Sequence, residues 1–275
     1  MSSERRTTSG NAITWTAMAI IAALVAAIYC YLGLHNPYVG FQADDALYLL
    51  MADVYSPYFE ATLPVYDHVR RYSQLPTLFP LLLGLLGAGT DNLPAARLGV
   101  AGFMVLAHLL FYLWLRSLAV PRKDALPIVA LHSLLPITLI HVSDLWSEGL
   151  YLCFTFLALL AFRYAQSNRL SVVSSVWAGL VVGCAIATRT VGVAFVPALL
   201  LVCYRGTFKG AALACAALAV FLALIANLGM GDAGHSYTDL LISSFSEDTA
   251  ARVYAQLATA ASTAWHGFAY DLLQL

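Results

Sequence analysis

AITWTAMAIIAALVAAIYCYLGL, residues 12–34, is an apolar run that contains no acidic or basic side chain. A helix of about 20 mainly apolar residues crosses the hydrocarbon core of a bilayer. The rest of the chain suits the same environment: 61% of its 275 residues are hydrophobic, 11% are charged, and the mean hydropathy is +0.77. An ordinary soluble domain carries about 25% charged residues. The composition therefore predicts an all-α, polytopic membrane protein.

Seven apolar runs of this kind follow one another along the chain. They lie at 12–34, 94–115, 124–142, 145–162, 171–188, 190–204 and 210–229. The first continues past the apolar core of a cleaved signal peptide, so we expect an uncleaved anchor. A further stretch, LPTLFPLLLGLLGAG at 75–89, is short for a span and carries Pro76 and Pro80 in its first half. We expect it to form a helix at the membrane interface.

Basic residues indicate the orientation, because Lys and Arg collect in cytoplasmic loops. With seven spans and a cytoplasmic N-terminus at 1–11, nine of the fourteen basic residues face the cytoplasm: Arg5, Arg6, Arg116, Arg122, Lys123, Arg163, Arg169, Arg205 and Lys209. A further span at 75–89 would leave only five there. We therefore predict a membrane module at 12–229, an outer loop at 35–93 and an outer C-terminal segment at 230–275.

Charge and cysteine content exclude several classes of protein. The net charge is -1, and no Lys/Arg-rich block exists that would neutralise a run of nucleic-acid phosphates. The five cysteines lie in apolar runs and form no CxxC pair, so neither a disulfide framework nor a zinc site is indicated. His108 and His132 lie within spans two and three, where we expect a hydrogen bond between helices. Aromatic residues near span ends, Trp146 among them, are typical interface anchors.

GFQADDALYLLM, residues 40–51, places Asp44 and Asp45 side by side in the outer loop. Five apolar side chains that follow share one face of a helix: Ala46, Leu47, Leu50, Met51 and Val54. We therefore expect an amphipathic helix on the membrane surface, with the aspartates at its cap and first turn. A cap favoured by the helix dipole explains one aspartate. The second carboxylate is then a candidate for binding or catalysis.

HVSDLWSEGLY, residues 141–151, supplies a second acidic pair on the same predicted face. Asp144 falls in a short outer turn, and Glu148 falls one helical turn later, just inside the fourth span. An ionisable group at membrane depth is by default a functional hypothesis. The alternative is an ion pair between Glu148 and Arg189, which lies at the outer junction of spans five and six. Both interpretations can hold together.

The order and spacing of these motifs resemble the GT-C glycosyltransferases, and among them the bacterial family 39-type, or dolichyl-phosphate-mannose-mannosyltransferase-like, proteins. The motifs are ADDALYLLMA, LPTLFPLLLGLLG, AARLGVAGF, SDLWSEGLYL and GCAIATRTVG, and the resemblance covers about residues 12–230. It implies a GT-C membrane module and a transferase. Such enzymes move a sugar from a polyprenyl-phosphate carrier to a lipid, glycan or protein hydroxyl, with inversion at C1.

The resemblance also implies roles for the acidic residues. Asp44 or Asp45 would be the general base that deprotonates the acceptor hydroxyl for an in-line attack on the sugar. We favour Asp44, because it lies nearer the end of the loop from the first span. Asp144 or Glu148 would hold the acceptor or the first carboxylate.

A cation near the leaving phosphate would stabilise the charge that develops there. Arg189 is the first candidate, and the loop DHVRRYSQ adds His68, Arg70 and Arg71. Two outer carboxylates suit a divalent cation, yet the family that this chain resembles generally works without one. We therefore expect no metal and no other cofactor. The expected partners are the lipid-linked sugar donor, the acceptor and the bilayer.

The resemblance implies a protein of the cell envelope, in a bacterial-type inner (plasma) membrane, with its active site on the outer face. Two alternatives stay open. Relatives continue into further spans, so the segment at 230–275 is expected to be truncated, and the chain would then be a non-catalytic subunit derived from a transferase module. A transporter is less favoured, because its ionisable groups usually lie near the bilayer midplane.

Overall fold

The computed structural model describes residues 4–36, 43–59, 65, 69, 75–167, 172–206 and 208–228. These residues belong to one compact unit, Met1–Gly231, whereas the unit Asp232–Leu275 lies outside the described residues. Among the described residues the secondary structure is helical, with no β-strand. The prediction of an all-α fold is therefore confirmed. The predicted C-terminal segment at 230–275 cannot be compared with the structure, because it falls outside the described part.

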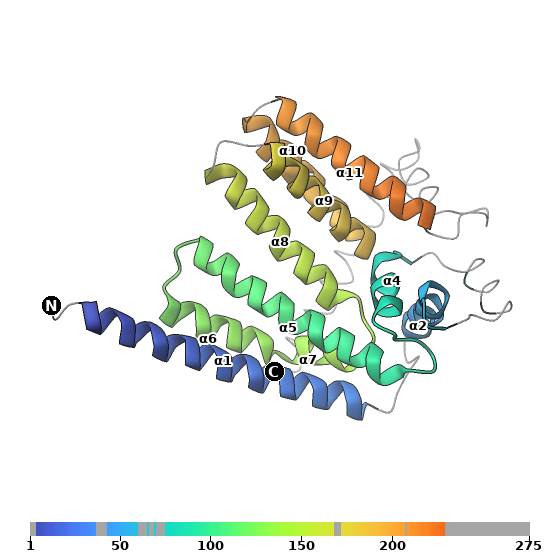
Figure 1. Ribbon diagram of the computed structural model, residues 1–275, viewed down its shortest axis with the longest axis horizontal. Helices are drawn as coiled ribbons and strands as arrows, with labels where there is room; N and C mark the ends of the chain where they lie inside the picture. The colour runs from blue at the N-terminus through green and yellow to red at the C-terminus, as the bar shows by residue number, and fades with distance from the viewer. Residues whose placement is uncertain are drawn as a thin grey trace, which may run out of the picture. The chain divides into compact units, whose positions relative to one another are not determined.

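The helices are α1 (Glu4–His35), α2 (Ala43–Tyr55), α4 (Leu78–Leu85), α5 (Leu93–Ser117), α6 (Arg122–Ser133), α7 (Pro136–Ser143), α8 (Glu148–Ser167), α9 (Val172–Thr188), the 3-10 helix η1 (Thr190–Ala194), α10 (Phe195–Gly206) and α11 (Phe208–Leu228) (Figure 1). Each of the seven apolar runs coincides with one helix or with a consecutive pair, α6 with α7 and η1 with α10. All seven runs are thus helical, as predicted. The stretch at 75–89 contains the short helix α4.

Length and composition make α5 the one described helix that is long and apolar enough to cross a bilayer. A second candidate consists of α6 and α7 taken together, which are bent by 55° at the break between them. The number of spans therefore stays a prediction. At eight residues, α4 is about 12 Å long, which is too short to cross a bilayer about 30 Å thick.

Small residues and leucines bring the helices together in two main clusters. One cluster joins α8, α9, α10 and α11 around Val182, Ile186 and Leu199. The other joins α2, α4 and α5 to the start of α8 around Phe79 and Leu83. In Figure 1, α8 runs between α5 and α9, and α11 lies against α9. The second cluster is the one that positions the candidate site.

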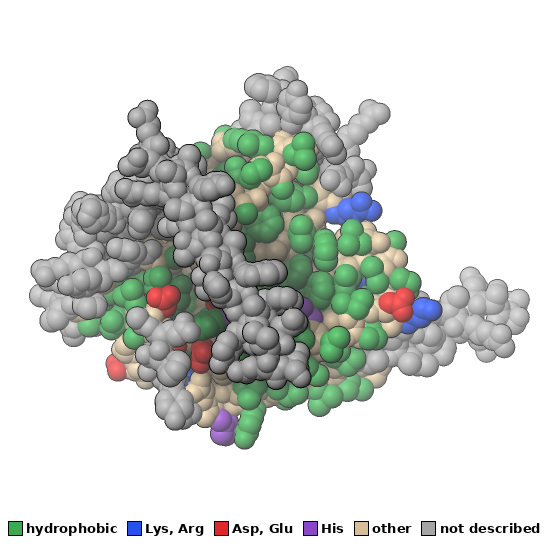
Figure 2. Space-filling model, turned by 180° about the vertical axis from the view of Figure 1, so that it is seen from behind, with side chains coloured by type: hydrophobic (Ala, Val, Ile, Leu, Met, Phe, Trp, Pro, Cys, Tyr) green, Lys and Arg blue, Asp and Glu red, His purple; other side chains and the backbone are tan. Residues whose placement is uncertain are grey.

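Large apolar side chains also cover much of the surface. On α1 and α5 the exposed ones are Ile20, Leu24, Ile28, Tyr31, Leu34, Leu98, Leu106, Leu109 and Leu113. Figure 2 shows apolar side chains spread over one face, where acidic and basic side chains are sparse. A soluble monomer rarely exposes contiguous apolar patches of more than a few hundred Å². The surface therefore agrees with the apolar composition of the sequence.

Candidate functional site

The two adjacent aspartates begin the helix α2. Because α2 begins at Ala43, both Asp44 and Asp45 lie in its first turn, and neither is the residue before the helix. Negative charge there is favoured by the positive end of the helix dipole. The two side chains differ sharply in environment, since Asp44 is exposed and Asp45 is only 3% exposed. The two residues are adjacent in the sequence but occupy different environments in the fold.

The buried face of α2 differs from the apolar face that the sequence indicated. Tyr48, Leu49 and Ala52 are buried with Asp45, at the i, i+3, i+4, i+7 spacing of one helical face. Of the five predicted side chains, only Met51 is buried, Ala46 is exposed, and Leu47, Leu50 and Val54 are half-buried. The prediction was incomplete, because α2 carries apolar residues on two neighbouring faces.

Packing against α4 decides which face of α2 turns inward. A Cβ atom at Gly84 of α4 would lie 2.6 Å from the carbonyl oxygen of Ala52, so the glycine lets the two helices approach closely. Asp53, near the end of α2, accepts hydrogen bonds from the backbone N–H of Thr90 at 3.0 Å and from its hydroxyl at 2.6 Å. Both contacts hold the C-terminal part of α2, and the face that includes Ala52 and Asp45 is the one that turns into the core.

The turn between α7 and α8 covers Asp45. The side chain of Trp146 and the backbone of Leu145 lie near enough to its carboxyl group to lower its pKa. Its Oδ1 atom is buried and has no hydrogen-bond partner among the described residues. This oxygen of the carboxylate is thus left with unused acceptor capacity.

Burial raises the pKa of Asp45 to about 6, and the negative charges of Asp144 and Asp44 add to the effect. The Trp146 side chain and the Leu145 backbone lower the pKa of Asp45, because N–H groups near a carboxylate favour its charged form. A carboxyl group that releases its proton near pH 6 is well matched to general-base chemistry near neutral pH.

The covering turn is itself anchored from two sides. The Asn36 side-chain amide donates to the carbonyl oxygen of Ser143 at 2.8 Å and to Oδ1 of Asp144 at 3.1 Å. The hydroxyls of Tyr48 and Ser147 share a hydrogen bond of 3.3 Å. Asp144 therefore lies in a short turn, as predicted, and its position next to Asp45 is fixed by contacts from α1 and α2.

Glu148 and Arg189 form a salt bridge. Glu148 is the first residue of α8, and Arg189 lies in extended conformation between α9 and η1. The chain turns sharply here, because a Cβ atom at Gly192 would lie 2.6 Å from the backbone of Ala185. The ion pair that the sequence offered as an alternative is thus present. With 39% of the Arg189 side chain exposed, a role at a donor phosphate stays a prediction.

Tyr48 connects the aspartates to this ion pair. Burial raises the pKa of the Tyr48 hydroxyl, the Ser147 hydrogen bond lowers it, and the charges of Asp44, Arg189 and Asp45 act on it as well. These groups therefore lie within electrostatic range of one another. The three segments that the sequence placed on one face converge here, and we call Asp44, Asp45, Tyr48, Asp144, Trp146, Glu148 and Arg189 the Asp45 cluster.

Sequence analysis missed three residues of this region. Tyr48 lies three positions after Asp45, on the same helical face, which is the signal that would have found it. Trp146 resembled an interface anchor, and only the fold shows that the turn that carries it lies against α2, where it lowers the pKa of Asp45. Arg97 of α5 is buried within electrostatic range of Asp144. This arginine belongs to the motif AARLGVAGF, but the sequence pattern did not indicate a role for it.

Three predicted phosphate ligands, His68, Arg70 and Arg71, lie outside the described residues. Among the residues that the structure describes, no group of three or more His, Cys, Asp or Glu side chains is arranged to hold a metal ion.

A separate polar cluster occupies the interior between α1, α5 and α6. Nδ1 of His108 bonds to the Met104 carbonyl at 2.8 Å, and Nε2 bonds to Nδ1 of His132 at 3.0 Å. A carbonyl only accepts, so Nδ1 of His108 carries the hydrogen, and a neutral His108 then accepts from His132. The predicted hydrogen bond between helices is confirmed.

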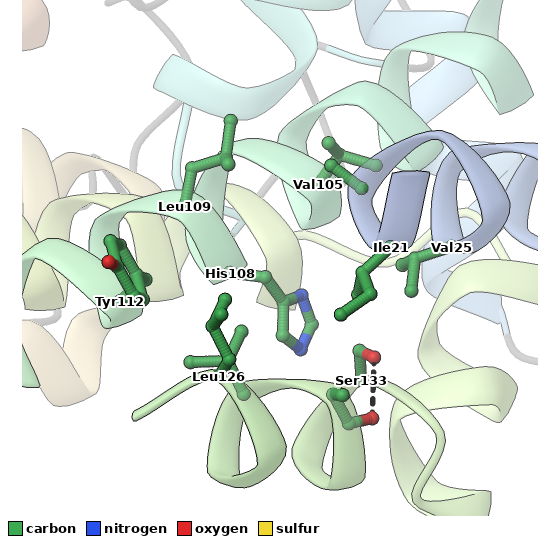
Figure 3. A pocket seen from close by; sticks show the side chains of 11 residues that line it. Ile21, Val25, Val105, His108, Leu109, Tyr112, Leu126 and Ser133 are labelled. Atoms are coloured by element: carbon green, nitrogen blue, oxygen red, sulfur yellow. Dashed lines mark hydrogen bonds between the residues drawn. The ribbon is translucent and has the colours of Figure 1, made fainter. Parts of the chain in front are cut away.

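His108 also lines a pocket of about 50 Å³ between α1, α5 and α6 (Figure 3). Its other lining residues are mostly apolar and include Ile21, Val25, Val105, Leu109 and Leu126. The carboxylates and the arginine of the Asp45 cluster are not among the residues that line it. The expected cavity shared by the aspartates and Arg189 stays a prediction.

The Asp45 cluster combines a buried carboxyl group that is able to take up a proton with a partly exposed cation and three further acids. Such a set supports proton abstraction beside a bound anion. Comparison of the chain with protein-family models, with curated proteins and with solved structures gives no match.

Proposed function

We propose that the protein is a membrane glycosyltransferase of seven spans, which moves a sugar from a polyprenyl-phosphate donor to a lipid, glycan or protein hydroxyl. The observation that carries the proposal is Asp45, a buried carboxylate with one unpartnered oxygen in the same cluster as a partly exposed arginine. The apolar helices and the exposed leucines support a membrane setting. We place the site on the outer face of a bacterial-type inner membrane, as the distribution of basic residues indicates.

In this proposal Asp45, rather than Asp44, is the general base. Its unpartnered Oδ1 takes the proton of the acceptor hydroxyl while the hydroxyl oxygen forms a bond to C1 of the sugar. The bond from C1 to the phosphate oxygen breaks, and polyprenyl phosphate leaves with the electron pair. One displacement inverts the configuration at C1. General-base help of this kind contributes ~10²- to 10⁴-fold to the rate.

Arg189 is the proposed partner of the leaving phosphate. A guanidinium group has five N–H donors, so the bond to Glu148 leaves others for a second anion. The partial exposure of the side chain supports this role. Asp144 and Glu148 would position the acceptor and the cation, respectively. No metal ion has a part in this scheme.

A second candidate function is transport, and one observation favours it. The pair α6 and α7 is broken and bent by 55°, near the buried His108 and the half-buried His132. Discontinuous helices with polar groups inside the bundle are typical of secondary transporters. A third candidate is a non-catalytic membrane subunit.

The test is turnover by the purified full chain in lipid nanodiscs, with a panel of polyprenyl-phosphate sugars and release of polyprenyl phosphate as the readout. We expect Asp45→Asn to lower the rate by a factor of 100 or more, Asp44→Asn to lower it less, and Asp124→Asn, a change at an exposed aspartate of α6, to leave it unchanged.

Two results would contradict the transferase. A folded wild-type chain that turns over no donor in the panel would support the non-catalytic subunit. Uptake of a solute into proteoliposomes, lost on His108→Leu but retained on Asp45→Asn, would support the transporter.

A further inference from the structure

A hydrogen bond between two hydroxyl groups joins the helix of Asp45 to the start of α8. The hydroxyl of Tyr48 in α2 lies 3.3 Å from Oγ of Ser147, and either group can be the donor. Both side chains are buried, with 5% of Tyr48 and 2% of Ser147 exposed. Breaking such a bond is costly, because a buried hydroxyl that loses its partner has no water to replace it. The bond is therefore a specific connection between these two helices.

Packing holds the ring of Tyr48 in place. It meets the ring of Phe79 in α4 edge to face, with centroids 4.9 Å apart and an interplanar angle of 84°. Phe79 is fully buried. Leu145 and Leu150, on either side of Ser147, belong to the same apolar cluster as these two rings. The Tyr48 hydroxyl therefore has little freedom to move away from Ser147.

The two ends of this hydrogen bond lie beside the two charges that the proposed reaction uses. Asp45 precedes Tyr48 by three residues, so both buried side chains lie on one face of α2. Ser147 directly precedes Glu148, which forms the salt bridge to Arg189. The path from the carboxylate to the guanidinium thus consists of one helical turn, the hydrogen bond, a peptide bond and the ion pair.

We propose that Tyr48 is a positioning residue: its hydrogen bond to Ser147 fixes the separation and the orientation of Asp45 relative to Arg189. The proposal rests on the proposed transferase function, in which Asp45 takes the proton of the attacking hydroxyl and Arg189 stabilises the leaving phosphate. An in-line displacement places the nucleophile, C1 and the leaving oxygen on one line, so these two groups must keep a set separation. A misplacement of about 1 Å can lower the rate by about 100-fold. Tyr48 touches neither donor nor acceptor in this scheme, and it acts through Asp45.

The first measurement tests the hydrogen bond without any assumption about activity. Tyr48→Phe keeps the ring against Phe79 and removes the hydroxyl, whereas Ser147→Ala removes the other partner. In a double-mutant cycle on the unfolding of the full chain in lipid nanodiscs, we expect a coupling of about 3- to 10-fold in the equilibrium constant, the effect of one hydrogen bond. Tyr31→Phe, at a position 61% exposed on α1, should show no coupling to Ser147→Ala. A cycle without coupling between positions 48 and 147 overturns the proposal.

The second measurement tests the positioning itself. Spin labels on Ala46→Cys in α2 and Val191→Cys in η1, both exposed positions, report the distance between the two segments in a chain whose five native cysteines are replaced by alanine. Tyr48→Phe in this labelled chain should broaden the distance distribution, and Tyr31→Phe should leave it as it is. A distribution that does not respond to Tyr48→Phe overturns the proposal.

The kinetics of transfer supply the third readout. Tyr48→Phe should lower kcat by about 10- to 100-fold and leave KM for the donor within about twofold, because the ground-state contacts of the donor are kept. Ser147→Ala should have the same effect, and the double variant should lose no more than either single one, because both changes break one bond. A change confined to KM, or a loss in the double variant that equals the product of the single losses, overturns the positioning role.

The positioning role and the transferase fail in different ways. A coupled hydrogen bond and a responsive distance distribution, in a wild-type protein that turns over no polyprenyl-phosphate sugar, support the connection and refute the transferase. Turnover by the wild type without any loss in Tyr48→Phe supports the transferase and refutes the positioning role.

Discussion

Glu148 and Arg189 meet across the ends of three helices, since Glu148 starts α8 and Arg189 separates α9 from η1. Consecutive antiparallel helices bring every second connection to the same end of a bundle, which is how two residues so distant in sequence form a salt bridge. The Arg189 side chain nevertheless stays partly exposed, so the salt bridge does not bury the cation.

The first prediction concerns that pair. We expect Glu148→Gln and Arg189→Gln to cost little stability, with a coupling of at most about 1 kcal/mol in a double-mutant cycle, because a partly exposed ion pair is screened by solvent. Binding of the polyprenyl-phosphate donor, measured by calorimetry, should be lost in Arg189→Gln and not restored by adding Glu148→Gln. Intact donor binding in Arg189→Gln would make the arginine purely structural.

The second prediction follows from the titration of Asp45. Its pKa is raised in the folded protein from 3.8 to about 6, so its contribution to stability is complete below about pH 4 and is lost as the pH rises through about 6. Asp45→Asn should remove this dependence and leave the protein more stable than the wild type at pH 7, by on the order of 1–3 kcal/mol. Thermal unfolding between pH 4 and pH 8 measures the difference; identical curves for the two proteins would refute it.

The third prediction compares two glycines. Gly84→Ala places a Cβ atom 2.6 Å from the Ala52 carbonyl oxygen, so we expect a loss of about 1–3 kcal/mol in the free energy of unfolding and a fall in transfer activity as α2 moves. Gly102→Ala in α5 meets no atom within 4 Å and should be neutral, or stabilising by up to about 1 kcal/mol. Chemical unfolding of both variants gives the comparison. Equal effects would show that α2 and α4 do not need their close approach.

The fourth prediction is the topology. In a chain whose five cysteines are replaced by alanine, Asp91→Cys should react with a membrane-impermeant maleimide added outside, because the predicted outer loop contains it. Ser117→Cys, at the other end of α5, should react only after the membrane is permeabilised. Labelling of position 117 from outside an intact cell would invert the predicted orientation.

Apolar length alone was enough to locate the seven helical runs, because a long uncharged segment has few ways to satisfy its backbone other than a helix. The pairing of Glu148 with Arg189 also followed from the sequence, since antiparallel helices with short connections constrain which turns meet. Neither inference needed side-chain detail.

The choice between Asp44 and Asp45 did need it. Neighbouring residues on a helix point about 100° apart, and α2 has apolar residues on both sides of that step. Periodicity cannot choose between two such faces. Which face of α2 turns inward depends on Gly84, forty residues later in the chain, because its missing side chain lets the backbone at Ala52 approach α4.

The break between α6 and α7 has a consequence for how the chain is made. Tyr29 of α1 donates its hydroxyl hydrogen to the Ser133 carbonyl at 2.7 Å, and Thr138 does the same for the His132 carbonyl at 2.9 Å. A backbone carbonyl without a hydrogen-bond partner raises the free energy of a helix in a hydrocarbon environment. Because α1 is synthesised first, it is already present when the broken pair emerges from the ribosome. The first helix would thus act as a template for inserting α6 and α7, and a chain that begins after residue 36 would meet the bilayer with one of these carbonyls unpaired.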